Sequence, residues 1–202
     1  MATDLQWALV MFVVVTLFTP GPNNTMLMTS GLNFGFRRGL PHLWGVTLGF
    51  SFMVLAVGLG LGAVFAAYPV LYALLKYAGA AYLLYLAWQI ATSGAPEAGE
   101  ASPDKAITFM QAAAFQWLNP KGWVMAVGAV STYAAVAAFP ANVGIIAFLF
   151  GVLGVLSSAT WLGFGTGLKR LLTSPRAVRA VNVTMALLLV ASLWPILSEA
   201  WR

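Results

Sequence analysis

The sequence predicts an all-α membrane protein whose six transmembrane helices form two three-helix inverted repeats, with the first and fourth helices broken. The first observation is composition: 61% of the 202 residues are hydrophobic and 7% are charged, whereas soluble domains carry about 25% charged residues. The second is that charges and prolines divide the chain into six apolar segments. The third is a proline-containing polar interruption inside two of those segments, one in each half of the chain.

The six segments follow from length, because a spanning helix needs about 20 apolar residues. They are Leu5–Ser30, Leu40–Ala66, Pro69–Thr92, Ile107–Tyr133, Asn142–Leu168 and Ala180–Ser198. The first lacks a basic leader and is too long for a signal sequence, so we expect it to remain as a span. A polar linker, 93–106, separates a first three-helix half (1–92) from a second (107–202).

The two halves resemble each other. Pro22 and Pro120 occupy similar positions in the first and fourth segments, and glycine-rich stretches, 58–62 and 163–167, end the second and fifth. An odd number of spans in each repeat forces the second copy to insert upside down. The sequence therefore predicts the inverted-topology arrangement that is common among secondary transporters.

Basic residues predict the orientation, because short cytoplasmic loops are enriched in lysine and arginine. The odd-numbered loops carry all of the loop cations: Arg37, Arg38, Lys105, Lys169, Arg170, Arg176 and Arg179. We therefore expect the linker to be cytoplasmic and both termini extracytoplasmic. The same distribution explains the net charge of +5. The expected partner of these cations is the lipid bilayer, and no nucleic-acid partner is expected.

The first break is the run Thr19-Pro20-Gly21-Pro22-Asn23-Asn24. Pro20 and Pro22 cannot donate backbone hydrogen bonds, and Gly21 between them permits unusual dihedral angles. We expect an unwound stretch and a new helix near Asn23, whose free N–H groups and positive dipole end suit a carboxylate. Asn23 and Asn24 add amides to this candidate substrate site. The alternative is a structural kink capped by asparagine.

The second break is Asn119-Pro120-Lys121, preceded by Gln116. Lys121 is the only charge between residues 106 and 168, and a charge at membrane depth costs about 2.5–3.5 kcal/mol or more. The six segments contain no aspartate or glutamate, so a substrate carboxylate is the natural counter-ion. We therefore predict that Gln116, Asn119, Pro120 and Lys121 bind substrate at the same cavity as the first break. The alternative is a lysine near a helix end that extends to the headgroups.

Other chemistry has little support in the sequence. His42 is the only histidine and lies at the predicted cytoplasmic edge of the second segment, where a tolerated interfacial residue is favoured over a proton relay. The chain has no cysteine and no clustered metal ligands, so we predict no cofactor and no enzymatic activity. Gly45 and Gly49 are interpreted as helix-packing residues.

Four ordered stretches together resemble the LysE/RhtB family of bacterial amino-acid exporters over essentially the whole chain. They are Thr19-Pro20-Gly21-Pro22-Asn23, Gly35-Phe36-Arg37-Arg38-Gly39, Lys76-Tyr77-Ala78-Gly79-Ala80-Ala81-Tyr82-Leu83 and Phe115-Gln116-Trp117-Leu118-Asn119-Pro120-Lys121. The resemblance implies an inner-membrane exporter of amino acids or close derivatives, driven by proton exchange, and a homodimer. Ala87 departs from the pattern, where the family usually has glycine.

Two questions stay open at the level of sequence. Proton exchange needs a titratable group, and Lys121, His42 or the substrate ammonium could carry the proton. The chain could also be a non-transporting membrane scaffold or assembly protein whose breaks are kinks. A polar cavity containing both Asn23 and Lys121 would distinguish a transporter from a scaffold.

Overall fold

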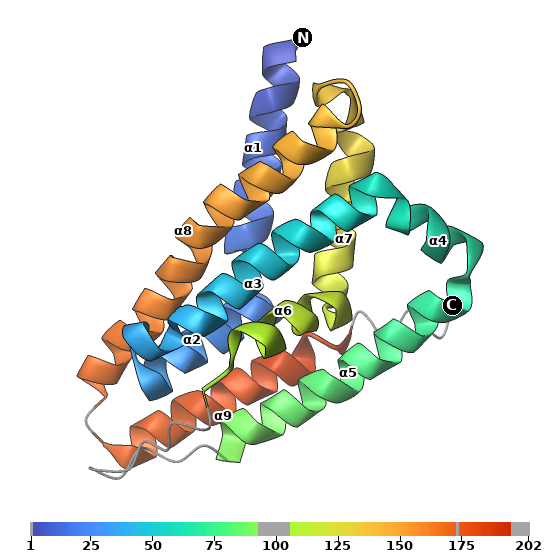
Figure 1. Ribbon diagram of the computed structural model, residues 1–202. Helices are drawn as coiled ribbons and strands as arrows, with labels where there is room; N and C mark the ends of the chain where they lie inside the picture. Colours follow the sequence, from blue (N-terminus) through green and yellow to red (C-terminus); the bar gives the residue numbers. More distant parts are fainter. Residues whose placement is uncertain (1, 93–105, 173, 195–202) are drawn as a thin grey trace.

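The computed structural model describes residues 2–92, 106–172 and 174–194, and every regular element in these ranges is a helix (Figure 1). The first half contains α1 (Ala2–Phe18), α2 (Pro22–Phe34), α3 (Phe36–Ala56), a π-helical turn (Val57–Leu61), α4 (Gly62–Ala67) and α5 (Pro69–Thr92). The second contains α6 (Phe109–Leu118), α7 (Pro120–Thr132), a 3₁₀ turn (Ala134–Val136), α8 (Ala141–Leu171) and α9 (Pro175–Ala191). Most of the predicted linker lies outside the described residues.

Both predicted helix breaks are confirmed. The chain bends by 52° between α1 and α2, and α2 starts at Pro22, one residue before the predicted start. Proline suits this first helical position, whose N–H would be unpaired in any case. In the second half, Asn119 has an extended conformation (φ −87°, ψ 108°) and separates α6 from α7.

Within the described residues, two helices are long and apolar enough to cross a membrane. They are Phe36–Val64, which joins α3 to its continuation, and α8; the bent pair of α1 and α2 adds a third if it is one span. The remaining helices do not meet these criteria in the described chain. The six-span count and the inverted repeat therefore remain predictions.

The long helices α3 and α8 pack against each other and form the centre of the fold (Figure 1). Helix α2 packs along α8, and α6 packs along α3. Helices α5 and α9 pair with each other and contact this centre mainly through α6 and α2. As a result, the two broken segments flank α3 and α8, and the breaks lie beside the middle of the molecule.

Helix α2 touches α8 backbone to backbone. A Cβ atom added at Gly31 would overlap the carbonyl oxygen of Leu162, and one added at Gly165 would overlap that of Met28. Small residues allow this approach, which is a common means of helix association in membranes. The α2–α8 interface therefore has no room for side chains at these two positions.

Helix α3 contacts α6 in the same way, which confirms the packing role predicted for two glycines. A Cβ atom at Gly45 would overlap the carbonyl oxygen of Phe109. One at Gly49 would lie 2.6 Å from the Cα atom of Ala113. Both central helices are thus held to a half-helix of the opposite half of the chain.

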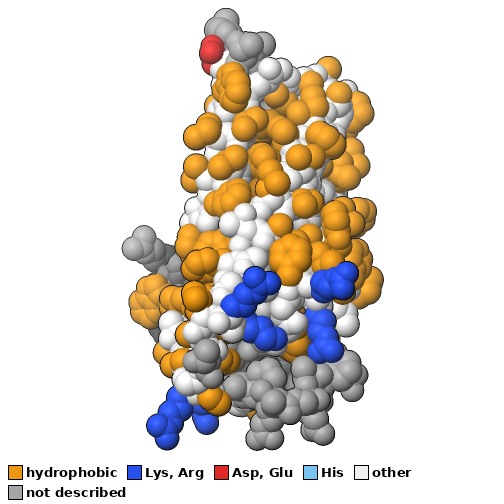
Figure 2. All heavy atoms as spheres, turned by 90° about the vertical axis from the view of Figure 1, so that its left-hand side faces the viewer, with side chains coloured by type: hydrophobic (Ala, Val, Ile, Leu, Met, Phe, Trp, Pro, Cys, Tyr) orange, Lys and Arg blue, Asp and Glu red, His pale blue; other side chains and the backbone are white. Residues whose placement is uncertain are grey.

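Charge is distributed unevenly along the molecule. Figure 2 shows lysine and arginine side chains gathered towards one end and an acidic side chain at the opposite end. We call the first the basic end; it comprises the α2–α3 connection, the end of α8 and the start of α9, with Arg37, Arg38, Lys169, Arg170, Arg176 and Arg179. Such clustering is the pattern expected of a cytoplasmic face.

A matched pair of glycines on α8 tests the tight α2–α8 interface. Gly165→Ala should force the helices apart and lower the melting temperature in detergent by roughly 5 °C or more, since overpacking costs about 1–3 kcal/mol. Gly167→Ala meets nothing within 4 Å and should melt at or slightly above the parent temperature, because alanine is the better helix former. Equal melting temperatures for the two variants would contradict the described packing.

Candidate binding site at the two helix breaks

The two breaks are joined by a reciprocal pair of amides. Asn23 Nδ2 donates to Gln116 Oε1 at 2.8 Å, and Gln116 Nε2 donates to Asn23 Oδ1 at 3.1 Å. Gln116 is fully buried and also donates to the carbonyl oxygen of Ala112 at 2.9 Å. The two bonds between Asn23 and Gln116 connect residues 93 positions apart. The predicted convergence of the breaks is therefore confirmed.

Side chains satisfy the carbonyl groups released at the first break. Asn24 Nδ2 donates to the carbonyl oxygens of Leu17, at 2.8 Å, and Thr19, at 2.9 Å. Ser157 Oγ also donates to Leu17, at 2.9 Å, and Lys121 Nζ also donates to Thr19, at 2.6 Å. Each of the two carbonyls thus has two side-chain donors, which replace the helical hydrogen bonds lost at the break.

Lys121 lies in the first turn of α7, and its side chain extends across the first break. A Cβ atom at Gly21 would lie 3.0 Å from Lys121 Cδ and 3.2 Å from Nζ, so glycine leaves the space that the lysine occupies. The ammonium group bonds to Thr19 in the site, which argues against the alternative that it extends to headgroups. Asp4, the only acidic residue in the described ranges, is near the start of α1.

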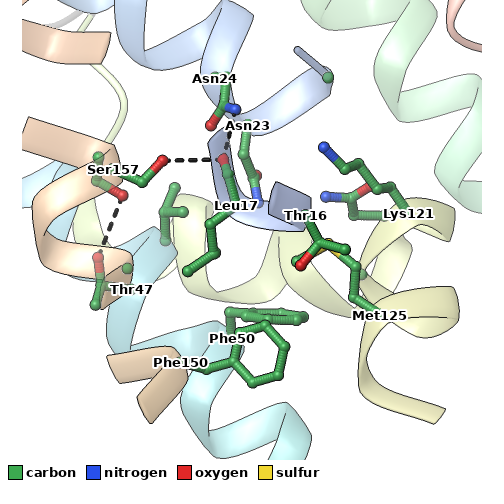
Figure 3. A pocket seen from close by; sticks show the side chains of 16 residues that line it. Thr16, Leu17, Asn23, Asn24, Thr47, Phe50, Lys121, Met125, Phe150 and Ser157 are labelled. Carbon is green, nitrogen blue, oxygen red and sulfur yellow. Dashed lines mark hydrogen bonds between the residues drawn. The ribbon is translucent and has the colours of Figure 1, made fainter. Parts of the chain in front are cut away.

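A small cavity of about 40 Å³ lies between the breaks and the central helices. Figure 3 shows Lys121 and Met125 on one side, Thr47 and Ser157 on the other, and the phenylalanine rings below. The lining residues are Thr16, Leu17, Gly21, Asn23, Asn24, Val46, Thr47, Phe50, Asn119, Lys121, Gly122, Met125, Phe150, Gly154, Ser157 and Ser158. This volume holds roughly two or three water molecules, so an amino acid needs the lining to move apart.

The cavity includes only part of the predicted site. The structure places five predicted residues in its lining: Gly21, Asn23, Asn24, Asn119 and Lys121. Four others are not in the lining: Pro20, Pro22, Gln116 and Pro120. The prolines shape the breaks, and Gln116 binds Asn23 from behind. Sequence reasoning missed the hydroxyl and aromatic residues of α3 and α8, because nothing in those apolar runs marks which residues face inward.

Asn119 lines the cavity and carries a buried acceptor without a partner. Its side chain is buried, with 2% exposure, and its Oδ1 atom has no hydrogen-bond partner. A buried acceptor without a partner costs about 1–3 kcal/mol, so such a group inside a cavity suits a bound donor. With Lys121 nearby in sequence, the lining offers a cation for an anionic group and an amide oxygen for a cationic one.

His42 is not at an interface, so that expectation was wrong. It is fully buried, and its Nδ1 atom lies 2.8 Å from Ser30 Oγ, while Nε2 has no partner. The reason is that α3 already starts at Phe36, which places His42 within the helix and against α2. The cavity lining does not include it. Among the described residues, no group of three or more potential ligands could hold a metal ion.

Comparison with known proteins identifies the family. The family model for LysE type translocators matches residues 14–192. This chain belongs to the LysE family. Similar relatives are the cysteine/O-acetylserine efflux proteins of Escherichia coli (strain K12), Shigella sonnei (strain Ss046) and Shigella flexneri. Each is 35% identical over 183 residues, which cover 89% of this chain and 90% of the relative. The search of solved structures found no match. LysE relatives are transporters that export amino acids, and this chain is a member of that exporter family.

The amide pair predicts strong coupling between Asn23 and Gln116. Asn23→Leu or Gln116→Met alone leaves a partly or fully buried amide without its partner and should destabilise the protein by about 1–3 kcal/mol. The double variant removes both amides and should be less destabilised than the sum, with a coupling energy of about 1 kcal/mol. Melting temperatures of the four proteins in one detergent measure this cycle. Strictly additive shifts would show that the two amides do not depend on each other.

Proposed function

We propose that this chain exports small zwitterionic amino acids across the bacterial inner membrane in exchange for protons, with the substrate bound between the two helix breaks. The observation that carries the proposal is the cavity that contains both Asn23 and Lys121. Broken helices at a cavity are typical of substrate sites in secondary transporters. The efflux activity named for the relatives supports the same reading.

The substrate carboxylate binds Lys121 and the start of α2. The Nζ atom lies beside Gly21, where α2 begins without a side-chain cap. Backbone N–H groups and the positive dipole end of a helix favour an anion at this position. Lys121 can leave Thr19 for a substrate, because Asn24 still donates to the same carbonyl.

The substrate ammonium binds the free oxygen of Asn119. Residues 119 and 121 are close along the chain at the second break, so one small zwitterion reaches both groups. Pairing the buried acceptor with an ammonium group removes the cost of leaving it unsatisfied. Asn23 remains bonded to Gln116 and holds the two breaks together while the substrate is bound.

Proton exchange requires a group that substrate binding affects. Lys121 meets this requirement directly, because it lines the cavity in which the substrate would bind. His42 bonds to Ser30 of α2 but does not line the cavity, so it could be coupled to transport only through a movement of α2. We therefore assign proton coupling to Lys121 ahead of His42.

The alternative function is a scaffold or assembly protein whose breaks are kinks. A kink needs satisfied backbone groups but does not need a lysine and an asparagine with an unpaired oxygen in the lining of one cavity. Those two groups favour transport over a scaffold.

Lys121→Met tests the assignment by removing the charge while keeping the aliphatic chain. Binding of labelled amino acid and counterflow in proteoliposomes should fall at least tenfold, and Lys121→Arg should restore little, because a planar fork cannot replace a compact ammonium. Both variants should insert and melt close to the parent, since Thr19 keeps a donor. Lys169→Met, which changes a lysine of the basic end, is the control and should retain counterflow within about twofold. Parent-like transport by Lys121→Met would refute the role of this residue.

Orientation can be tested at the two ends of α8, since the chain has no native cysteine. Ala138→Cys lies exposed just before α8, and Leu171→Cys is exposed at its last residue, at the basic end. In intact spheroplasts a membrane-impermeant maleimide should label Ala138→Cys and spare Leu171→Cys until the cells are lysed, because basic ends face the cytoplasm. The opposite labelling pattern would show that the protein has the reverse orientation in the membrane.

A further inference from the structure

Two buried residues of the cavity wall carry hydroxyl groups that share a single, long hydrogen bond. Thr47 of α3 is 3% exposed and Ser158 of α8 is 4% exposed. Their hydroxyl oxygens lie 3.3 Å apart, whereas an ordinary O–H···O bond measures about 2.7–2.8 Å. This long contact between α3 and α8 is the only hydrogen bond that the structure gives either hydroxyl.

Several threonines of the described helices satisfy their hydroxyls within their own helix. Thr16 donates to Phe12 at 2.7 Å, Thr160 to Leu156 at 2.8 Å and Thr166 to Leu162 at 2.9 Å, each to the carbonyl four residues earlier. This is the usual arrangement for a hydroxyl in an apolar helix. Thr47 and Ser158 lack it but line the cavity, so their hydroxyls keep unused bonding capacity, which is costly in a buried position unless a ligand uses it.

The adjacent serine has a different role. Ser157 lines the same wall but donates at 2.9 Å to the carbonyl oxygen of Leu17, at the first break. Its hydroxyl therefore stabilises the unwound backbone. This difference separates one structural hydroxyl from two that remain free for recognition.

The free hydroxyls lie across the cavity from the lysine. In Figure 3, Thr47 and Lys121 are on opposite sides, with the aromatic rings of Phe50 and Phe150 below. Those rings meet edge to face with centroids 5.1 Å apart and form an apolar floor. A substrate whose carboxylate binds Lys121 therefore directs its side chain towards α3 and α8.

We propose that Thr47 and Ser158 determine specificity by hydrogen bonding to the side chain of the substrate. They would favour small amino acids that end in a hydroxyl, a thiol or an ester oxygen over hydrocarbon side chains of the same size. The proposal rests on the proposed function, because it assumes that an amino acid occupies this cavity. Gly154 packs closely against Thr47, since a Cβ atom there would lie 3.3 Å from Thr47 Cγ2.

The test uses three substrates of nearly equal shape: L-serine, L-cysteine and L-2-aminobutyrate. Each is supplied as competitor in proteoliposome counterflow, and the ratio of half-inhibitory concentrations is compared between proteins. The parent should prefer serine and cysteine to 2-aminobutyrate. In Thr47→Val with Ser158→Ala that preference should fall about fivefold, the value of roughly one hydrogen bond, while 2-aminobutyrate changes less than twofold.

Three single variants keep the test decisive. Thr47→Ser retains the hydroxyl and should keep the parent preference, even if the double variant does not fold. Thr160→Val removes a hydroxyl that is satisfied within α8, and this variant should also keep the parent preference. Ser157→Ala should weaken all three substrates alike, because it acts on the break.

The outcomes separate the two proposals. An unchanged preference in the double variant or in Thr47→Val alone, or no preference in the parent, overturns the role of the hydroxyls while leaving amino-acid transport intact. Absence of counterflow with every amino acid in the well-folded parent would instead overturn the proposed function.

Discussion

The need to satisfy backbone carbonyls at the first helix break determines most of the structure around the cavity. The helix is interrupted there by two prolines, so carbonyl groups at the break need donors other than the next helical turn. Asn24, Ser157 and Lys121 come from three different helices and all donate to Leu17 or Thr19. The break is therefore possible only when α7 and α8 are in place, so local unwinding and tertiary packing form together.

Because each carbonyl has two donors, one donor can leave to bind a ligand without a large energetic penalty. When one donor turns to a ligand, the carbonyl keeps the other, and the cost is closer to the net value of one hydrogen bond, about 1 kcal/mol, than to that of an orphaned group. Lys121 benefits most, because its present partner is already served by Asn24. A cation that is held in place but easily released suits a site that must bind and discharge its cargo repeatedly.

The sequence predicted the breaks well because proline and asparagine act locally. It also identified Lys121, since a lone charge in a long apolar run has few stable positions. It could not assign Gln116 to its role as partner of Asn23, because that pairing depends on how α2 and α6 meet. It missed Thr47 and Ser158 for a related reason: a hydroxyl in an apolar helix usually bonds to its own backbone, and only packing shows which ones do not.

The error over His42 has an equally physical cause. Distance from a charged loop suggested an interface, but Gly35 alone separates α2 from α3. A connection of one residue brings α3 back against α2 at once, so His42 is already buried beside Ser30 of α2. The burial of a residue near a tight connection thus depends on how the short loop folds the two helices together. Hydropathy along the chain does not report this.

The glycine contacts imply that the fold is mechanically uneven. Where α2 meets α8, backbone lies directly on backbone, and any sliding must first lift one helix off the other. Where α1 meets α7, contact is made through side chains: the rings of Phe12 and Tyr133 are 5.5 Å apart, and a Cβ atom at Gly128 would meet only Phe12, at 3.7 Å. Side chains can change rotamer and allow such an interface to shear at low cost. The stiffness of the molecule is thus concentrated at one end and its compliance at the other.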